Sequence, residues 1–469
     1  MDDARLRWIA LTVAAAMFVH NLDSTLITTS LPQIAATFGL RAVDLSAAIS
    51  GYVLASAALL PLSAWLADRH GARDVFVLAV ALFTLASAGC AVAQNYPQFL
   101  VARLLQGAAG ALMLPVGRAV VLQRSEGRDL LKAVALITWP ALLAPVIAPL
   151  LGGVITTYST WRWNFLLNVP LGAIAIVAAL RLLPRAEKHE RRSLDVPGML
   201  YLVTGLSGLL YAMDRFAGDT GQGMLTLVAL LVGASALLLG LRHLHRSPAP
   251  LMDLSAYSVP TFRLSNGGAA LVFRASIAAT PFLLPLLLQL GYGLNALQAG
   301  TFVMAYFVGN LAMKPATNPL LRWFGFRNLL VANTIISTAL AAGCGLLTPM
   351  TPSVTILLLI LVLGFSRSMQ FTCIGTMGFA DIAPAAMSQA TTLTATAQQI
   401  SLSVGVGVAA QVLNTSMWWR HGDHLQPIDF SVTFWVVGAI AATSALIFAR
   451  LAPDAGSSVS GHSKRAESH

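Results

Sequence analysis

Long apolar stretches separated by short polar connections run along almost the whole chain. Because the hydrocarbon core of a bilayer is about 30 Å thick, a helix needs about 20 residues to cross it. Fourteen stretches are long enough, and each is predicted to be a transmembrane helix. They cover approximately residues 8–31, 46–66, 75–94, 98–120, 132–157, 163–183, 195–214, 224–242, 262–289, 298–320, 327–347, 353–376, 391–416 and 430–451. The pattern predicts an all-α polytopic membrane protein.

Composition supports this prediction. Hydrophobic residues make up 57% of the 469 positions and charged residues 10%, whereas a soluble domain carries about 25% charged residues. The formal charge of +10 would suggest a nucleic-acid partner in a soluble chain. Here the basic residues gather in short loops between apolar stretches, so they indicate topology, and no nucleic-acid partner is expected.

The distribution of basic residues predicts the orientation of the chain in the membrane. With the N-terminus in the cytoplasm, the cytoplasmic segments hold 20 of the 29 Lys and Arg, and the outer segments hold 4. Cytoplasmic loops of membrane proteins are enriched in Lys and Arg, so both termini are predicted to be cytoplasmic. The 5 remaining basic residues lie within the predicted spans: Arg103, Arg118, Arg274, Lys314 and Arg367.

A repeated sequence element predicts the domain organisation. Gly71-x-Arg73 and Gly325-x-Arg327 are offset by 254 residues, and each follows the second helix of a six-helix half if spans 7 and 8 are an insertion. Transporters are commonly built from such repeats around a midplane site. The predicted domains are a six-helix bundle (1–190), two inserted helices (191–250), a second six-helix bundle (251–452) and a disordered cytoplasmic tail (453–469).

The sequence carries no motif for ATP hydrolysis or for a common hydrolytic site. No GxxxxGK[ST] pattern occurs, so ATP is not expected to supply the energy. No HExxH pattern or nucleophile elbow occurs either. Cys90, Cys344 and Cys373 all lie in apolar stretches, which is typical of small buried residues and predicts neither a metal site nor a disulfide. We expect a protein that is not an enzyme and needs no cofactor.

Four stretches resemble motifs of the major facilitator superfamily. "WLADRHGAR" (residues 65–73) is similar to its loop motif, and "LVARLLQGAAGALMLPVGR" (100–118) to its fourth-helix motif. "NLDSTLITTSLPQIA" (21–35) and "WRWNFLLNVPLG" (161–172) resemble the fourteen-helix drug:proton antiporters of that superfamily. The resemblance implies two six-helix bundles plus two inserted helices, alternating access and proton-coupled efflux. It also implies a bacterial inner-membrane location.

The same resemblance implies a set of gate and motif residues. We expect Asp68 to cap a helix or to pair with Arg73 across the cytoplasmic gate. Small residues and prolines on spans 4 and 5 are expected to allow close approach or bending of helices. The span 5 motif departs from the family pattern, with Ala144 and Ala148 where Gly is frequent. The residues assigned to this group are Asp68, Arg69, Gly71, Arg73, Gln106, Gly107, Pro149, Gly152 and Gly153.

Asp23 is a carboxylate in the middle of the first predicted span. It lies 15 residues from the inner end of the span, roughly 22 Å, and Arg103 lies 5 residues from the outer end of span 4, roughly 8 Å. In a core of about 30 Å these depths coincide. The family resemblance implies that the first and fourth helices are neighbours, so an ion pair between Asp23 and Arg103 is predicted. Burial favours the protonated acid and the arginine favours the carboxylate, which suits proton coupling. The alternative is a static ion pair that fixes helix packing.

His20 lies three residues before Asp23, on the same helical face. It could relay protons, because histidine titrates in the physiological range. A hydrogen-bonded core histidine is the alternative.

Two arginines lie near the middle of predicted spans in the second half. Arg274 lies about 18 Å deep and Arg367 about 21 Å, and no neighbouring span interior supplies an acid. They favour a substrate with a carboxylate or other anionic group. The alternative is that they bond to carbonyl groups, Gln289 or Gln370. The predicted substrate-binding residues are Arg274, Arg367, Gln289, Gln370 and Asn21.

These observations predict a secondary active transporter that exports drugs or small organic compounds in exchange for protons. Its partners are a small-molecule substrate, protons and the lipid bilayer, and a monomer is expected. One alternative is an exporter of organic anions such as carboxylates. Another is a membrane sensor that does not transport, or an intramembrane enzyme.

Overall fold

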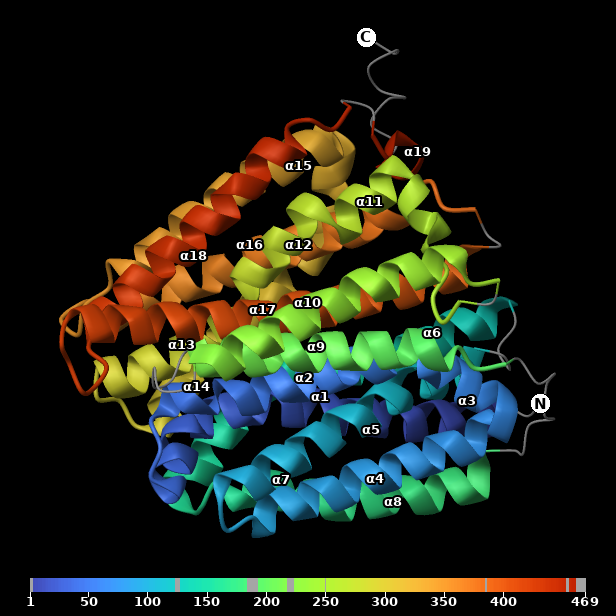
Figure 1. Ribbon diagram of the computed structural model, residues 1–469, viewed down its shortest axis with the longest axis horizontal. Helices are drawn as coiled ribbons and strands as arrows, with labels where there is room; N and C mark the ends of the chain where they lie inside the picture. Colours follow the sequence, from blue (N-terminus) through green and yellow to red (C-terminus); the bar gives the residue numbers. More distant parts are fainter. Residues whose placement is uncertain are drawn as a thin grey trace. The chain divides into compact units, whose positions relative to one another are not determined.

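The computed structural model of the protein describes residues 3–122, 127–183, 193–216, 223–248, 250–383, 386–452 and 455–460. Within these ranges the chain forms helices joined by turns and loops, and no strand is present (Figure 1). The predicted all-α fold is confirmed. Contacts between Cα atoms divide the chain into two compact units.

The first unit comprises residues 1–215, 219–251 and 295–300. It therefore includes the described part of the predicted inserted pair except Phe216, whereas the predicted boundary at 190 lies outside the described residues. Its helices are α1 (Asp3–Phe38), η1 (Ala42–Leu45), α2 (Ser46–Leu59), α3 (Leu62–His70), α4 (Ala72–Val92), α5 (Tyr96–Leu122), α6 (Gly127–Tyr158), α7 (Arg162–Leu166), α8 (Asn168–Leu182), α9 (Val196–Phe216) and α10 (Gly223–Arg246).

The second unit comprises residues 216–218, 252–294 and 301–469. Most of the predicted disordered tail lies outside the described residues. The helices from here to the end of the described chain are η3 (Leu254–Ser258), α11 (Pro260–Asn266), α12 (Gly268–Ala278), α13 (Thr280–Leu286), the π-helix η4 (Leu287–Gly291), α14 (Ala296–Ala312), α15 (Lys314–Gly345), α16 (Ser353–Phe379), α17 (Met387–Trp419), α18 (Pro427–Phe448) and α19 (Ser457–Ser460).

Twelve helical stretches among the described residues are long and apolar enough to cross a membrane. Two further apolar stretches, Val196–Ala212 and Ala296–Ala312, are shorter, so the count of fourteen spans stays a prediction. Proline and glycine shift several boundaries. Pro61 separates α2 from α3 within predicted span 2, and α15 begins at Lys314, inside predicted span 10.

The repeated Gly-x-Arg element has the same backbone geometry in both units. Gly71 has φ 91° between α3 and α4, and Gly325 has φ 71° inside α15, where it breaks the regular helix. Positive φ costs a glycine little but strains residues with a Cβ. Each glycine therefore permits a sharp change of direction between two helices, which explains why this residue recurs with an offset of 254.

Both units also contain the same close helix crossing. A methyl group on Gly107 of α5 would overlap the carbonyl oxygen of Tyr52 on α2, and one on Gly364 of α16 would overlap the carbonyl oxygen of Tyr306 on α14. Tyr52 and Tyr306 are offset by 254 residues, the same offset as the loop glycines. Glycine lets two membrane helices approach until their backbones touch. The two units thus share a repeated construction.

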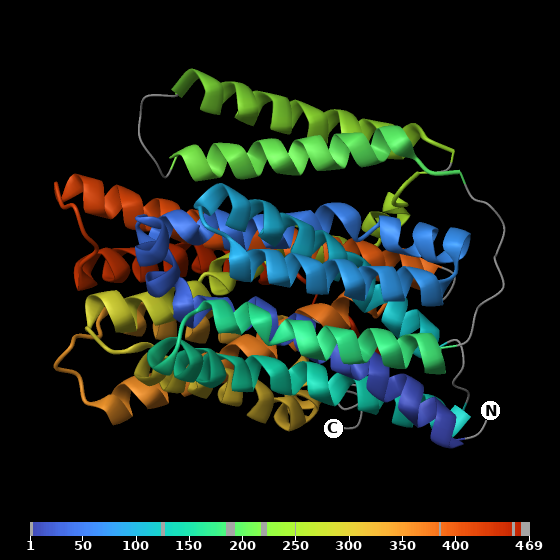
Figure 2. The ribbon, with the colours of Figure 1, turned by 90° about the horizontal axis from the view of Figure 1, so that it is seen from below.

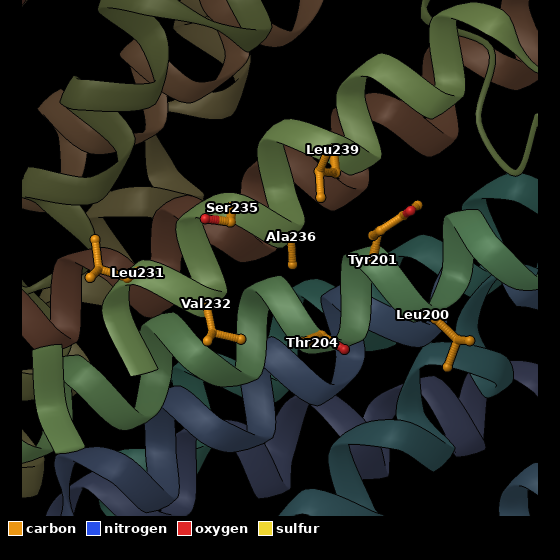
Figure 3. A pocket seen from close by; sticks show the side chains of 8 residues that line it. All are labelled: Leu200, Tyr201, Thr204, Leu231, Val232, Ser235, Ala236 and Leu239. Atoms are coloured by element: carbon orange, nitrogen blue, oxygen red, sulfur yellow. The ribbon is translucent and has the colours of Figure 1, made fainter. Parts of the chain in front are cut away.

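Helices α9 and α10 lie side by side as an antiparallel pair (Figures 1 and 2). They meet at small residues, because a methyl group on Gly208 would come within 2.8 Å of Ala229 O and one on Gly233 within 3.0 Å of Gly205 O. A shallow groove of about 450 Å³ lies between the two helices (Figure 3). The groove is lined by Leu200, Tyr201, Thr204, Leu231, Val232, Ser235, Ala236 and Leu239.

Asp195 fixes the start of α9. Its Oδ1 accepts from Gly198 N at 2.9 Å and from His243 Nε2 of α10 at 2.7 Å, and its Oδ2 accepts from Leu251 N at 2.9 Å. Burial of the carboxyl raises its pKa, but the bonds from Gly198, His243 and Leu251 outweigh burial and hold the pKa below its usual range. One carboxylate therefore joins both inserted helices to the segment that follows them.

We predict that Gly364→Ala strongly destabilises the protein. The added Cβ overlaps a backbone carbonyl that cannot move aside, and overpacking of this kind costs about 1–3 kcal/mol or more. Thermal unfolding of the purified protein in detergent measures the loss. Gly375→Ala in the same helix is the matched control, because its Cβ would meet nothing within 4 Å. Equal stability of the two variants would contradict the crossing.

Asp195→Ala is expected to lower stability at neutral pH by about 1 kcal/mol, the usual effect of losing an N-cap. A carboxylate whose pKa is lowered on folding stabilises the protein above its unfolded pKa of about 3.9, and that contribution is lost as pH falls through the folded value. The difference between wild type and variant should therefore shrink below about pH 4. Thermal unfolding at pH 7 and pH 3.5 tests this, and a difference that is unchanged by pH would refute it.

Candidate functional site

Asp23 on α1 is enclosed by donors from two other helices of the first unit. The residue is 1% exposed. Arg103 Nη1 (α5) donates to Asp23 Oδ2 at 2.8 Å. Its Oδ1 accepts from Nε2 of Gln106 (α5) at 2.9 Å and from Nδ2 of Asn168 (α8) at 2.7 Å. The predicted contact between Asp23 and Arg103 is present.

A second layer of hydrogen bonds extends the site to α4. Ser87 Oγ accepts from Gln106 Nε2 at 2.7 Å and from Asn168 Nδ2 at 3.3 Å, and it donates to Phe83 O at 2.8 Å. Gln106 Oε1 also accepts from Arg103 Nη1 at 2.5 Å. The network joins α1, α4, α5 and α8. In a low-dielectric interior such bonds strengthen one another, so a change at one group alters the others.

Aromatic rings cover the remaining faces of the Arg103 guanidinium. Its Cζ lies 4.2 Å from the centroid of the Tyr52 ring and 5.7 Å from that of Phe165. The residue is 1% exposed, and its Nε has no hydrogen-bond partner among the described residues. Removing one partner of a buried ion pair leaves an uncompensated charge, which costs about 3–5 kcal/mol. Asp23 and Arg103 therefore depend on each other.

His20 packs beside this site. Tyr52 Oη lies 3.0 Å from His20 Nδ1, and a methyl group on Gly110 would overlap the imidazole. The same tyrosine thus contacts the histidine with its hydroxyl and Arg103 with its ring face. No hydrogen bond from His20 to Asp23 is present among the described residues. Both readings of His20, proton relay and hydrogen-bonded core residue, stay open.

Four further predicted residues of the first unit lie on α1 and α6. Asn21 is half-buried, and its Nδ2 donates to Met17 O at 2.9 Å within the same helix. Pro149 and Gly153 are buried on α6. Gly152 packs on α1, because a methyl group there would come within 2.9 Å of Leu26 O. Roles in substrate binding and gating stay predictions for these residues.

Asp68 is expected from the sequence either to cap a helix or to pair with Arg73, and among the residues it describes the structure does not show the second of these contacts. No ion pair joins them within the described ranges; Arg73 Nη2 instead donates to Leu180 O at 2.6 Å. Leu180 lies in the last turn of α8, where carbonyl groups have no partner within the helix and attract cations. Arg69 lies over the ring of Trp65, 5.1 Å from its centroid. In this structure Arg73 therefore binds a helix C-terminus and not the Asp68 carboxylate.

Arg274 and Arg367 lie within the second unit, on α12 and α16. Arg274 is 3% exposed, and its Nη1 donates to Asn266 Oδ1 at 3.3 Å. Arg367 is half-buried, with its Cζ 5.2 Å from the ring centroid of Phe371 and 5.4 Å from that of Tyr306. The Nε of each arginine has no hydrogen-bond partner, and neither forms an ion pair with a described residue. Both cations therefore lack an acid in the part of the chain that is described.

The two predicted glutamines of the second unit differ in their surroundings. Gln370 is 0% exposed, and it bonds Asn333 Nδ2 at 2.8 Å, Thr334 Oγ1 at 2.9 Å and Leu330 O at 3.2 Å. These bonds join α16 to α15, so the Gln370 amide contributes to the packing of these two helices. Gln289 is half-buried in the π-helix, and its Nε2 donates to Pro285 O at 3.2 Å.

Asp429 corrects the expectation that no neighbouring span of the second half contains an acid. Helix α18 begins at Pro427, three residues before the predicted span, so Asp429 lies in its first turn and is 0% exposed. Its Oδ2 accepts from Arg420 Nη2 at 2.8 Å, and its Oδ1 accepts from Ser416 Oγ at 2.8 Å. The carboxylate is thus paired with the loop arginine and with neither Arg274 nor Arg367.

Asn168 and Ser87 are parts of the site that the sequence reasoning missed. Asn168 lies inside the stretch "WRWNFLLNVPLG", and Ser87 is a hydroxyl within an apolar helix. A polar side chain at the depth of Asp23 is the available signal for both. Serine is so frequent in membrane helices that this signal could have singled out Asn168 alone.

The apolar helices, the repeated helix crossings and the buried ion pair define the class as multi-span membrane transporters. A profile of the Major Facilitator Superfamily matches residues 13–406. The chain is 33% identical over 463 residues to "Putative multidrug resistance protein MdtD" of Salmonella paratyphi A, covering 96% of this chain and 95% of the relative. The MdtD protein of Salmonella typhimurium is equally similar, with 33% identity over the same coverage.

Solved structures share the fold at low sequence identity. The POT family transporter PepTSo has a TM-score of 0.70 at 13% identity, covering 100% of this chain and 99% of that one. A D-xylose-proton symporter has a TM-score of 0.66 at 13% identity, covering 96% and 98%. The chain belongs to the major facilitator superfamily. It is a multi-pass membrane transporter of small molecules and not an enzyme.

Proposed function

We propose that the protein exports drugs or other small organic compounds from the cytoplasm in exchange for protons, by alternating access. The observation that carries this proposal is the fully buried Asp23 carboxylate, whose single cationic partner among the described residues is Arg103. An ionisable group inside a membrane span is expensive and is usually functional. The charge of Asp23 can be neutralised either by Arg103 or by a proton. Exchange between these two states would couple proton movement to the conformational change of alternating access.

Similarity to MdtD supports efflux of drugs as the direction and substrate class. The relatives are described as multidrug resistance proteins, and the similarity extends over nearly the whole chain. Their bacterial origin supports an inner-membrane location, and the excess of basic residues in the predicted inner loops supports cytoplasmic termini. We take the protein to act as a monomer, with fourteen spans arranged as two six-helix bundles and an inserted pair.

A second candidate substrate class is organic anions such as carboxylates. It is favoured by Arg274 and Arg367, whose Nε atoms lack partners and which form no ion pair with a described residue. An arginine binds a carboxylate through paired hydrogen bonds, so an anionic substrate would satisfy these donors. A lipophilic cation would instead be repelled at close range in a low-dielectric site.

Asp23→Asn is expected to abolish proton-driven transport while the protein still folds and inserts. The amide is nearly isosteric and can still accept from Arg103, but it cannot titrate. Flux in proteoliposomes under an imposed pH gradient measures the effect. Asp44→Asn is the control, because Asp44 is a partly exposed acid paired with Arg41 outside this network. Wild-type flux in Asp23→Asn would rule out Asp23 as the proton carrier.

Arg274→Gln and Arg367→Gln are each expected to weaken substrate binding, and the double variant to lose it. Losing one charge-assisted contact costs about 1.5–3 kcal/mol, or roughly tenfold or more in affinity. Binding of carboxylates and of cationic drugs to purified protein should be measured in parallel, with the exposed Arg263→Gln as control. Unchanged affinity in the double variant, or binding of cationic drugs without any response to carboxylates, would contradict the anion candidate.

A further inference from the structure

The Asp23 carboxylate is the acceptor in all three of its side-chain hydrogen bonds. Arg103 Nη1, Gln106 Nε2 and Asn168 Nδ2 each point an N–H at one of its oxygens. An ionised carboxylate only accepts, so this arrangement suits the charged form. Once a proton is bound, the carboxyl gains an O–H that must find an acceptor. A buried O–H without an acceptor would be costly, so the network must supply one.

Two of the three acceptors around Asp23 are already engaged. Gln106 Oε1 accepts from Arg103 at 2.5 Å. Ser87 Oγ accepts from two amides, and its own hydrogen goes to Phe83 O at 2.8 Å. The third acceptor, Asn168 Oδ1, is buried and has no hydrogen-bond partner among the described residues. Asn168 is 0% exposed, and its other amide atom already lies 2.7 Å from Asp23 Oδ1.

We propose that Asn168 is a positioning residue that switches with the protonation state of Asp23, an inference that rests on the proposed role of Asp23 as proton carrier. With the carboxylate charged, Asn168 donates through Nδ2. When a hydronium ion transfers a proton to a lone pair of Asp23 Oδ1, the new O–H bond forms as an O–H bond of hydronium breaks, and water is released. Rotation of the Asn168 amide then exchanges Nδ2 and Oδ1, so the carbonyl accepts from the new O–H.

Rotation of the Asn168 amide makes contacts between neighbouring helices depend on the protonation state of Asp23. Rotation withdraws the Asn168 N–H from Ser87, the bond that spans 3.3 Å in the charged state. Asn168 is the first residue of α8 and Ser87 lies on α4, so the link between these helices changes as Asp23 changes charge. Arg103 loses its charged partner at the same time and keeps Gln106 and the Tyr52 ring. Protonation therefore alters contacts among four helices in one step.

Asn168→Leu tests the proposal because leucine has a similar size but neither donates nor accepts. The matched control is Asn164→Leu. Asn164 is a buried asparagine on α7 that also has an Oδ1 without a partner, but it donates to Ser30 and does not contact Asp23. Asn168→Thr is the conservative variant, because its hydroxyl can donate or accept. It also keeps the test open if Asn168→Leu does not fold.

The first readout is the pH dependence of flux in proteoliposomes that contain the full-length protein. Asn168→Leu removes a charge-assisted bond to the carboxylate and a weaker bond to the protonated acid. Because the charge-assisted bond contributes more, the pH of half-maximal coupling should rise by about one unit. It should rise less in Asn168→Thr and stay unchanged in Asn164→Leu. A midpoint that is the same in wild type, Asn168→Leu and Asn168→Thr would overturn the proposal.

The second readout is infrared difference spectroscopy between high and low pH, on purified wild-type protein with and without ¹³C-labelled asparagine. The switch predicts a carboxylic-acid C=O band that Asp23→Asn removes, together with a label-sensitive asparagine C=O band. In Asn168→Leu the acid band should move to higher frequency, because its O–H has lost its acceptor. A shifted flux midpoint with no label-sensitive band would make Asn168 a fixed donor and overturn the switch.

Failure of the proposed function would look different. In that case Asp23→Asn would retain proton-driven flux, and no carboxylic-acid band would depend on Asp23, whatever the Asn168 variants do. If Asp23→Asn loses coupling while the Asn168 variants behave as wild type in both readouts, the proposed function stands and the switch is refuted.

Discussion

The first unit is organised around one buried ion pair. Asp23 and Arg103 are each 1% exposed, and neither charge is tolerable alone in a low-dielectric interior. Their requirement for each other fixes how α1 meets α5, and the amides of Gln106 and Asn168 bring α4 and α8 into the same network. One ion pair and its hydrogen bonds therefore connect α1, α4, α5 and α8. Any event that changes the charge of Asp23 must change the contacts among all of them.

The fold and the site differ in how far the sequence could predict them. Helix content follows from apolar length, because a bilayer admits few alternatives, and the Gly71 and Gly325 pair revealed the repeat. The Asp23 contact with Arg103 followed from the matching depths of the two residues, together with the neighbouring first and fourth helices that the family resemblance implied. Features that the bilayer restricts to few possible arrangements, such as helix content and the pairing of buried charges, can therefore be predicted from one sequence.

The remaining features depend on details that periodicity does not carry. Whether Arg73 meets Asp68 or the carbonyl of Leu180 is decided by where α8 ends, and both outcomes satisfy the same charge. A three-residue shift at the start of α18 brought Asp429 into a helix that the prediction had left without an acid. Asn168 escaped notice because a single amide in an apolar stretch looks like ordinary helix packing until its partner is known.

Comparison of the two units shows that the repeat preserves the scaffold and not the charges. Tyr52 and Tyr306 occupy equivalent crossings, each against a glycine of the neighbouring helix. At the offset of 254 that relates these tyrosines, His20 corresponds to Arg274 and Asp23 to the apolar Ile277.

The first unit thus combines a balanced ion pair with a buried histidine, whereas the second holds Arg274 and Arg367 without an acid partner among the described residues. A balanced pair can exchange its cation for a proton, but a lone arginine cannot lose its charge in a protein. Under the proposed function, proton exchange therefore belongs to the first unit, and the fixed positive charge of the second is available to an anionic group on the substrate.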